Sequence, residues 1–228
     1  MYVVDRSFPT FYRNPATHDA ALIQLGKTLR RVHDLPLPTE AASRDARAFL
    51  AEVWSRRASA FAVPGFVNDA VERLLAEQVP DSGRPIVVSH NDLNPTNIVY
   101  DGENILLHDW DTAGPNDPFY DLAVVSLFLR MDDNACLKLL EAHDGAPVSH
   151  LPARFTYDRR LAAILCCAVF MQLAQQQGHP GATGNETLES TLSLAEFYKQ
   201  LMAGAFTIAS AEGQWRFGLA LLKEAGPA

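Results

Sequence analysis

The segments with strong strand propensity are confined to residues 86–110, and this restriction most limits the folds open to the chain. IVVSH (86–90), NIVY (97–100) and NILLHDW (104–110) are short and rich in β-branched and apolar residues, and the intervening DGEN is typical of a tight turn. Apolar residues elsewhere recur mostly with helical spacing. The sequence therefore predicts a mainly α (α+β) fold, a helical bundle around one small β-hairpin.

The helical pattern begins with Leu22, Leu25, Leu29 and Val32, which share one helix face, and it stops at the prolines of HDLPLP. Residues 1–15 are expected to be a linker, with a short strand at YVV (2–4) and a loop in the Pro- and Asn-containing FPTFYRNP. Residues 16–228 are expected to form the helical domain. Its further helices are predicted at about 39–60, 67–78, 121–131, 134–143, 158–177, 187–206 and 214–225.

The composition excludes some classes of partner. A formal net charge of -8 argues against nucleic acid, whose phosphates are bound mainly by clustered Lys and Arg. No window approaches the length of a membrane span, and the N-terminus lacks the pattern of a signal peptide, so a cytoplasmic protein without a membrane partner is expected. Cys136, Cys166 and Cys167 lie in apolar helical patterns and are expected to be reduced core residues.

Polar side chains are concentrated around the expected hairpin. If its strands pair, Asp92, Asn97 and Asp109 lie at one rim, and two carboxylates with an amide oxygen suit Mg²⁺. The spacing H-x-D-x-x-x-x-N, followed by a strand and D-x-D, is that of a phosphoryl-transfer site. Taken singly, such Asp and Asn residues are more often turn formers. Together, at this spacing, they favour the catalytic interpretation.

The segment HNDLNPTNIVYDGENILLHDWDTAGPNDPFYDLA (90–123) resembles the catalytic core of the aminoglycoside phosphotransferase and choline kinase family, the protein-kinase-like small-molecule kinases. The helix that ends in LRRVHDLPLP also resembles a family helix. The resemblance implies the C-terminal lobe of a kinase-like fold, with its catalytic segment at 86–123 and ATP as phosphoryl donor.

The same resemblance implies roles for individual residues. Asp92 would be the catalytic base, Asn97 and Asp109 the Mg²⁺ ligands, and His90 a buttress of the loop. Asp121 would cap the following helix and hold the loop by hydrogen bonds. Asp111 would touch the metal or a cationic substrate.

The resemblance also implies a small amine or alcohol substrate of the choline, ethanolamine, thiamine or aminoglycoside type. Aromatic rings attract such ammonium groups. The candidate binding residues are Trp110, Asp117, Tyr120 and Trp215, although ordinary core packing explains most aromatic residues equally well.

Members of the family begin with a β-rich lobe that carries a strand lysine for the ATP phosphates, and this sequence shows no such lobe. Its lysines, at positions 27, 138, 199 and 223, all fall in helical patterns. Three interpretations remain open: a kinase whose N-terminal β-lobe is missing from the sequence, a non-catalytic small-molecule-binding protein, and a scaffold that forms a homodimer through the face left by the missing lobe.

Overall fold

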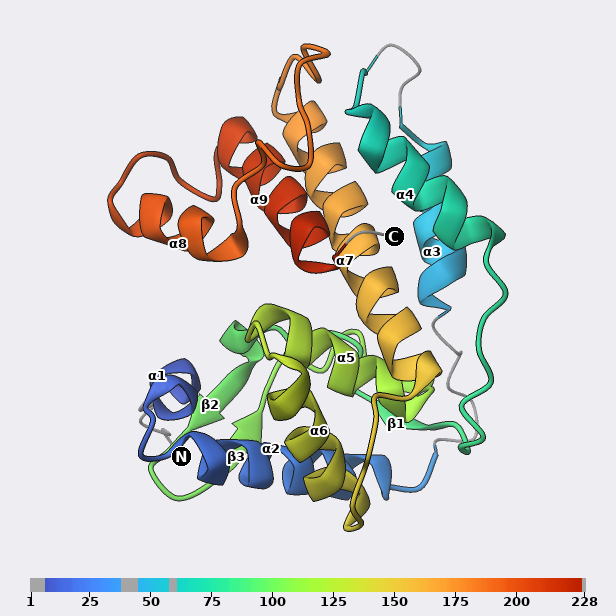
Figure 1. Cartoon of the computed structure of the whole chain (residues 1–228), viewed down its shortest axis with the longest axis vertical. Coiled ribbons are helices and arrows are strands. Elements are labelled where there is room, and N and C mark those ends of the chain that lie inside the picture. Colours follow the sequence, from blue (N-terminus) through green and yellow to red (C-terminus); the bar gives the residue numbers. More distant parts are fainter. Residues whose placement is uncertain (1–6, 38–44, 58–60, 227–228) are drawn as a thin grey trace. The chain divides into compact units, whose positions relative to one another are not determined.

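The computed structural model describes residues 7–37, 45–57 and 61–226 (Figure 1). Two compact units make up the chain: the first combines residues 1–44 with 80–159, and the second combines 45–79 with 160–228. The boundary near residue 159 falls inside the longest described helix, α7 (Ala153–Gln176). The strand expected at residues 2–4 lies outside the described residues.

The first unit is built on the packing of helix α2 (His18–His33) against helix α6 (Asp133–Asp144). Helices α1 (Phe8–Arg13) and α5 (Pro118–Phe128) also contact α2. The side chains of Leu22, Leu25 and Leu29 are fully buried, so the predicted apolar face of this helix is confirmed. Helix α5 is buried on all sides, as its largely apolar sequence requires.

Two small antiparallel sheets complete the first unit. Strands β2 (Ile98–Tyr100) and β3 (Ile105–Leu107) form the predicted hairpin, with Ile98 opposite Leu107. Strand β1 (Val87–Ser89) pairs instead with β4 (Gly114–Asn116). The sequence did not predict β4, because Gly, Pro and Asn are typical of turns and rare in strands.

The prediction of a loop after residue 7 was wrong, because Phe8–Arg13 forms helix α1. Its proline, Pro9, lies in the first helical turn, where the missing N–H removes no helical hydrogen bond. Phe8 and Tyr12, one turn apart, are buried with their rings stacked at 6.4 Å. The apolar spacing therefore outweighs the loop-forming composition.

The described residues of the second unit form helices joined by loops. It contains α3 (Ala46–Ser55), α4 (Gly65–Ala76), most of α7, α8 (Leu194–Met202) and α9 (Ala211–Glu224). Helix α8 is shorter than the predicted helix at 187–206, because Ser193 and Glu196 form a capping box that fixes the helix start. Phe197 and Phe217 join α8 to α9, with ring centroids 4.9 Å apart.

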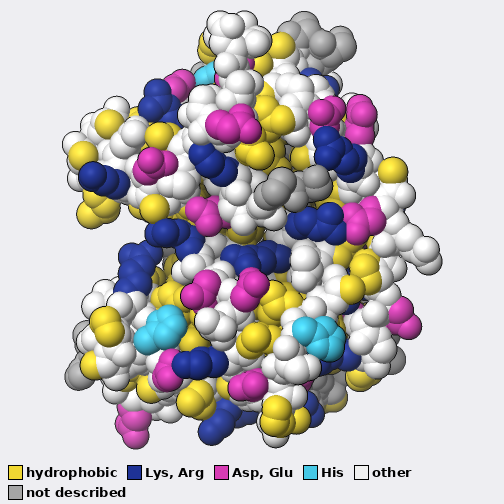
Figure 2. All heavy atoms as spheres, in the orientation of Figure 1, with side chains coloured by type: hydrophobic (Ala, Val, Ile, Leu, Met, Phe, Trp, Pro, Cys, Tyr) yellow, Lys and Arg dark blue, Asp and Glu magenta, His cyan; other side chains and the backbone are white. Residues whose placement is uncertain are grey.

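Other predictions concern the cysteines and the membrane. Cys136 and Cys167 are buried and Cys166 is half-buried, as expected of core residues. Within the part of the chain that the structure describes, no helix is both long and apolar enough to cross a bilayer. Acidic and basic side chains are interspersed over the face in Figure 2.

Gly26 is the residue that lets α2 approach α6 closely. A Cβ atom there would lie 2.7 Å from Ala142 Cβ, 2.8 Å from Leu139 O and 2.9 Å from His143 N. We expect Gly26→Ala to lower the free energy of unfolding by ~1–3 kcal/mol, because overpacking outweighs the better helix propensity of alanine. Urea denaturation measures this.

Gly65→Ala is the matched control for this measurement. Gly65 begins α4, and a Cβ atom there would meet nothing within 4 Å. A loss of stability in Gly65→Ala as large as that in Gly26→Ala would contradict the packing argument.

Candidate functional site

The loop that connects β1 to β2, residues 90–97, brings Asp92 and Asn97 together. Asn97 lies in a single 3₁₀ turn (Pro95–Asn97), and its Nδ2 donates to the Asp92 carbonyl at 2.8 Å and to Asp92 Oδ2 at 3.1 Å. Asn94 begins that turn, and its Nδ2 donates to Asp92 Oδ1 at 3.1 Å. Both carboxylate oxygens of Asp92 are therefore held by side-chain amides.

Asp109 lies at the same end of the hairpin as Asn97. The Asn97 carbonyl accepts a hydrogen bond from His108 N at 3.1 Å, and Asp109 follows directly. Asp109 is exposed and has a φ of 64°, in the left-handed region that residues other than glycine rarely adopt. Such backbone conformations are frequent at functional sites.

The side-chain atoms at this end of the hairpin that could bind a metal ion are hard oxygens. Because the Asn97 Nδ2 is bonded to Asp92, the Oδ1 is the atom of this amide left to accept, and it lies 3.4 Å from the Thr96 hydroxyl. Over the described ranges, no three His, Cys, Asp or Glu side chains form a metal-binding group. A divalent cation held here would therefore need the Asn97 amide oxygen beside carboxylates, a set that suits Mg²⁺.

His90 is fully buried and ties the loop to His108, the residue that follows β3. Its Nε2 lies 3.0 Å from the carbonyl of His108, which can only accept, so Nε2 carries the hydrogen. Its Nδ1 accepts from Asp92 N at 3.3 Å. Both ring nitrogens of the neutral imidazole are thus occupied by the backbone, an arrangement that suits a structural residue rather than a proton carrier.

Asp121 fixes the start of the 90–97 loop by hydrogen bonds. Its carboxylate is fully buried and accepts from His90 N at 2.7 Å, Asn91 N at 2.8 Å and His33 Nε2 at 3.2 Å. Burial alone would raise the pKa of Asp121. The hydrogen bonds and charge of His33, together with the two backbone amides, outweigh burial and hold this pKa below its ordinary value. Asp121 is therefore an anion within the core.

The prediction that Asp121 caps helix α5 was wrong. The N-cap is Asp117, whose carboxylate accepts from Phe119 N at 2.9 Å. Asp121 lies one turn further along and points instead at the 90–97 loop.

The network continues beyond Asp121 through residues for which the sequence predicted no role. His33 Nδ1 lies 2.9 Å from His143 Nε2, and His143 Nδ1 lies 2.7 Å from Asp144 Oδ1. Arg84 binds both oxygens of Asp144. Only His33, in the segment LRRVHDLPLP, had been noted as part of a pattern; His143, Asp144 and Arg84 carry no local signal.

The predicted substrate-binding residues lie in different environments. Trp110 is 39% exposed and lies beside the loop, with its ring 4.7 Å from that of His90. Asp111 is also exposed. Tyr120 is buried in α5, and Asp117 is buried by its capping role. In this neighbourhood the structure thus leaves Trp110 and Asp111 most accessible to a ligand.

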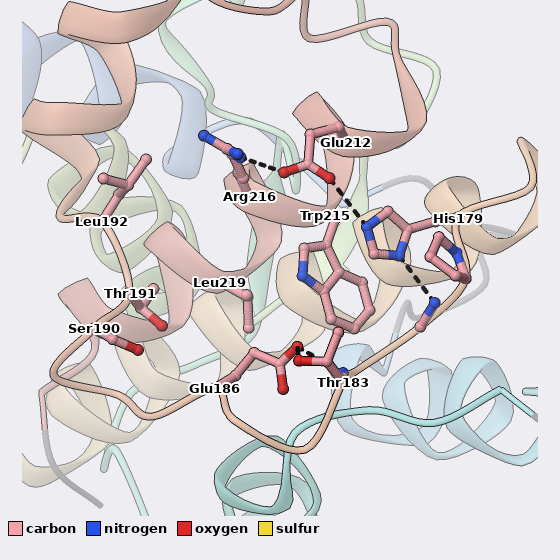
Figure 3. A pocket seen from close by; sticks show the side chains of 12 residues that line it. His179, Thr183, Glu186, Ser190, Thr191, Leu192, Glu212, Trp215, Arg216 and Leu219 are labelled. Atoms are coloured by element: carbon pink, nitrogen blue, oxygen red, sulfur yellow. Dashed lines mark hydrogen bonds and ion pairs between the residues drawn. The ribbon is translucent and has the colours of Figure 1, made fainter.

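Trp215 belongs to the second unit, where it lines a cavity of about 480 Å³ (Figure 3). The ring of His179 stacks on it at 4.3 Å. Glu212 pairs with both His179 and Arg216, and the Glu186 carboxylate is held by Thr183. The acidic groups of this cavity are therefore already bonded within the unit.

Comparison with known proteins identifies the family. The family model described as "Phosphotransferase enzyme family" matches residues 9–162, which is more than half of the chain. The chain therefore belongs to the phosphotransferase enzyme family. No protein in a search of curated sequences matches it.

Solved structures share the fold at low sequence identity. A choline/ethanolamine kinase family protein from Mesorhizobium loti is 17% identical with a TM-score of 0.60, and the match covers 96% of this chain and 70% of that one. The choline kinase LicA from Streptococcus pneumoniae is 15% identical with a TM-score of 0.56, and the match covers 100% of this chain and 68% of that one. A spectinomycin phosphotransferase in complex with ADP and spectinomycin is 15% identical with a TM-score of 0.52, and the match covers 97% of this chain and 70% of that one. The fold is therefore that of the kinase-like phosphotransferases.

Removing the charge of Asp121 tests its role as the support of the loop. In Asp121→Asn the amide has one acceptor oxygen for three donors, and its NH₂ group would face an N–H. We expect the free energy of unfolding at pH 7 to fall by ~3–5 kcal/mol, as for a broken buried ion pair. Chemical denaturation of the two proteins over a range of pH measures this.

The pH dependence of that difference has a definite sign. Because the folded-state pKa of Asp121 lies below its ordinary value, its stabilising contribution is present above about pH 4 and is lost as the pH falls further. The difference in the free energy of unfolding between wild type and Asp121→Asn should therefore become smaller as the pH falls below about 4. Asp69→Asn, at an exposed position on α4, is the control and should stay close to wild type. A gap that widens below pH 4 would contradict the assignment.

Proposed function

We propose that this protein is an ATP-dependent phosphotransferase that acts on a hydroxyl group of a small, amine-containing molecule. Family membership supports phosphoryl transfer in general. The observation that carries the specific proposal is the pairing of Asp92 with Asn97 at the end of the hairpin where Asp109 also lies.

Asp92 is the proposed acceptor of the proton from the attacking hydroxyl. Each carboxylate oxygen has more than one lone pair, so the amides of Asn94 and Asn97 fix its orientation and still leave positions for a substrate hydroxyl. Phosphoryl transfer depends mainly on positioning and on neutralisation of charge, so a held carboxylate is an advantage.

Asn97 and Asp109 are the proposed Mg²⁺ ligands. Their oxygen donors fit this ion, as described above. When bound, Mg²⁺ would neutralise the negative charge of the nucleotide phosphates. The left-handed backbone at Asp109 would direct its carboxylate at the end of the hairpin rather than along it. Asp111 is a further candidate for the metal or for a cationic group of the substrate.

ATP is the proposed donor, and the related spectinomycin phosphotransferase solved with ADP supports this choice. The lysines of this sequence lie in α2, α6, α8 and α9, so none is a strand lysine of the kind that holds phosphates in the family. We infer that tight nucleotide binding needs residues beyond those described, either from a β-lobe or from a second copy of the chain.

An amine-containing substrate is favoured by the surroundings of the loop. Trp110 offers a partly exposed indole ring next to His90, and Asp111 adds a negative charge one residue later. A ring face and a carboxylate together attract an ammonium group. Trp215, in the second unit, is a further candidate.

Replacing Asp92 tests the proposed catalytic role. We expect Asp92→Asn to lower kcat for transfer from Mg²⁺-ATP to a panel of amino alcohols and aminoglycosides by at least ~100-fold, because the amide cannot accept the proton. Affinity for Mg²⁺-ATP, measured by calorimetry, should change little. Glu103→Gln, on the exposed turn of the same hairpin, is the control and should retain activity.

Undiminished transfer in Asp92→Asn would overturn the role of this residue. If the wild type instead binds small ammonium compounds, detected as a rise in Tm, without turnover and without affinity for Mg²⁺-ATP, the protein is a binding module rather than an enzyme. Light scattering on the same samples reports whether it is a homodimer.

A further inference from the structure

Two buried histidines connect Asp121, which holds the 90–97 loop, to the ion pair between Asp144 of helix α6 and Arg84. In order, the contacts run from Asp121 Oδ2 to His33 Nε2 (3.2 Å), from His33 Nδ1 to His143 Nε2 (2.9 Å), and from His143 Nδ1 to Asp144 Oδ1 (2.7 Å). His33 is 5% exposed and His143 is 4% exposed. Both rings are therefore held between two carboxylates with little access to water.

The number of hydrogens in these contacts is fixed by their geometry. Each of the three contacts needs one hydrogen, and an ionised carboxylate supplies none. The ring nitrogens must therefore carry all three, whereas two neutral imidazoles carry one each. Two hydrogens would leave one contact without a donor, and four would place two N–H groups against each other at the centre. The histidine pair must hold one extra proton.

Asp121 and Asp144 are both anions, which this argument requires. For each carboxyl group, burial alone would raise the pKa. The hydrogen bonds and charges around them outweigh burial, from His33 and the loop amides at Asp121 and from His143 and Arg84 at Asp144, so both pKa values lie below the ordinary range.

Arg84 decides which histidine holds the extra proton. Its guanidinium binds both oxygens of Asp144, at 2.7 Å for the first, and so matches that charge. Among the described residues, Asp121 has no arginine or lysine partner, so the extra charge is better placed on His33. His143 is then neutral, with its hydrogen on Nδ1. Burial lowers the pKa of His143, the hydrogen bond to Asp144 raises it, and the positive charge of His33 lowers it again; the net shift is downward, as a neutral ring requires.

The packing of α2 against α6 fixes the distance between the two rings. Gly26 lies against the backbone of α6 so closely that a Cβ atom there would lie 2.9 Å from His143 N. With the helices in this contact, the rings meet edge to face, with centroids 5.0 Å apart. His143 is thus held where its Nε2 can accept from His33.

We propose that His143 is a positioning residue for the 90–97 loop: its Nε2 accepts the second N–H of His33 and keeps His33 as an imidazolium ion against Asp121. Asp121 in turn binds the backbone N–H groups of His90 and Asn91, the two residues that precede Asp92. The importance of this support for catalysis rests on the proposed function, whereas the protonation of His33 does not.

Other charged groups face the pair and set its response to pH. At the C-terminal end of α2, Arg30 and the C-cap residue Asp34 form an ion pair. The charge of Arg30 acts on Asp144, and that of Asp34 acts on both histidines. Arg84 approaches through Asp144 from the segment before β1. The surface next to His143 and Asp144 is lined further by Lys27 and Arg31. The nearest anion to His33 remains Asp121, which favours the imidazolium ion.

Nitrogen NMR of the histidine side chains in the full wild-type chain tests the protonation directly. At pH 7 we expect both ring nitrogens of His33 to show the shifts of protonated nitrogen. His143 should show one protonated nitrogen, Nδ1, and one acceptor. A neutral His33 in the folded wild type at pH 7 would overturn the proposal without any substitution being needed.

Two substitutions of His143 test the positioning. In His143→Gln the amide can accept from His33 and donate to Asp144, so His33 should stay protonated and amide exchange at His90 and Asn91 should stay slow. In His143→Leu the acceptor is lost, and exchange at these two amides should rise at least ~10-fold, as for the loss of a charge-assisted hydrogen bond. Exchange in α9 is the internal reference for global stability.

His150→Leu is the matched control, because His150 is exposed and its hydrogen bond, among the described residues, is to the neighbouring Ser149. Equal exchange rates at His90 and Asn91 in wild type and His143→Leu would overturn the positioning role. If His143→Leu does not fold, the test rests on His143→Gln. In that variant, amide exchange at His90 and Asn91 as fast as global unfolding alone would produce would also overturn the positioning role.

These measurements need neither nucleotide nor substrate, so their failure is separate from failure of the proposed function. Where transfer activity is found, His143→Leu should lower kcat with little change in KM, and His143→Gln should restore it. A residue with a purely structural role would not show both the rescue of kcat by His143→Gln and a change in the charge of His33.

Discussion

The structure of the site depends on one buried carboxylate. Asp121 is fully enclosed, yet it is ionised because two backbone amides and a histidine donate hydrogen bonds to it. An anion in the core is tolerable only when it is fully bonded. The 90–97 loop meets that requirement at its first two residues, and the carboxylate in return fixes where the loop begins.

From that fixed start the remainder of the loop follows by short-range bonds. His90 ties the loop to His108, and Asn94 and Asn97 hold the carboxylate of Asp92. The hairpin then returns the chain so that Asp109 follows a residue bonded to Asn97. Most of the polar side chains that crowd this part of the sequence therefore bond to each other or to the backbone.

Local patterns allowed much of this to be predicted. The spacing of His90, Asp92 and Asn97, and the strand that leads to Asp109, indicated both the hairpin and the class of chemistry. Strand β4 and helix α1 were not predicted, because Gly-Pro-Asn and a Pro- and Asn-containing segment suggest turns when tertiary contacts are unknown. His143 and Asp144 could not be found either. They reach His33 through the packing of α2 on α6, across 110 residues of sequence, and no short pattern reports such a contact.

The most direct test of the account is a crystal structure of the protein with Mn²⁺ in place of Mg²⁺ and with ADP, in which anomalous scattering locates the metal. We expect a metal ion bound by the amide oxygen of Asn97 and the carboxylate of Asp109, with Asp92 beside it and directed at the open space in front of the nucleotide phosphates. A metal bound elsewhere, or a structure in which Asn97 and Asp109 face away from each other with the nucleotide present, would contradict it.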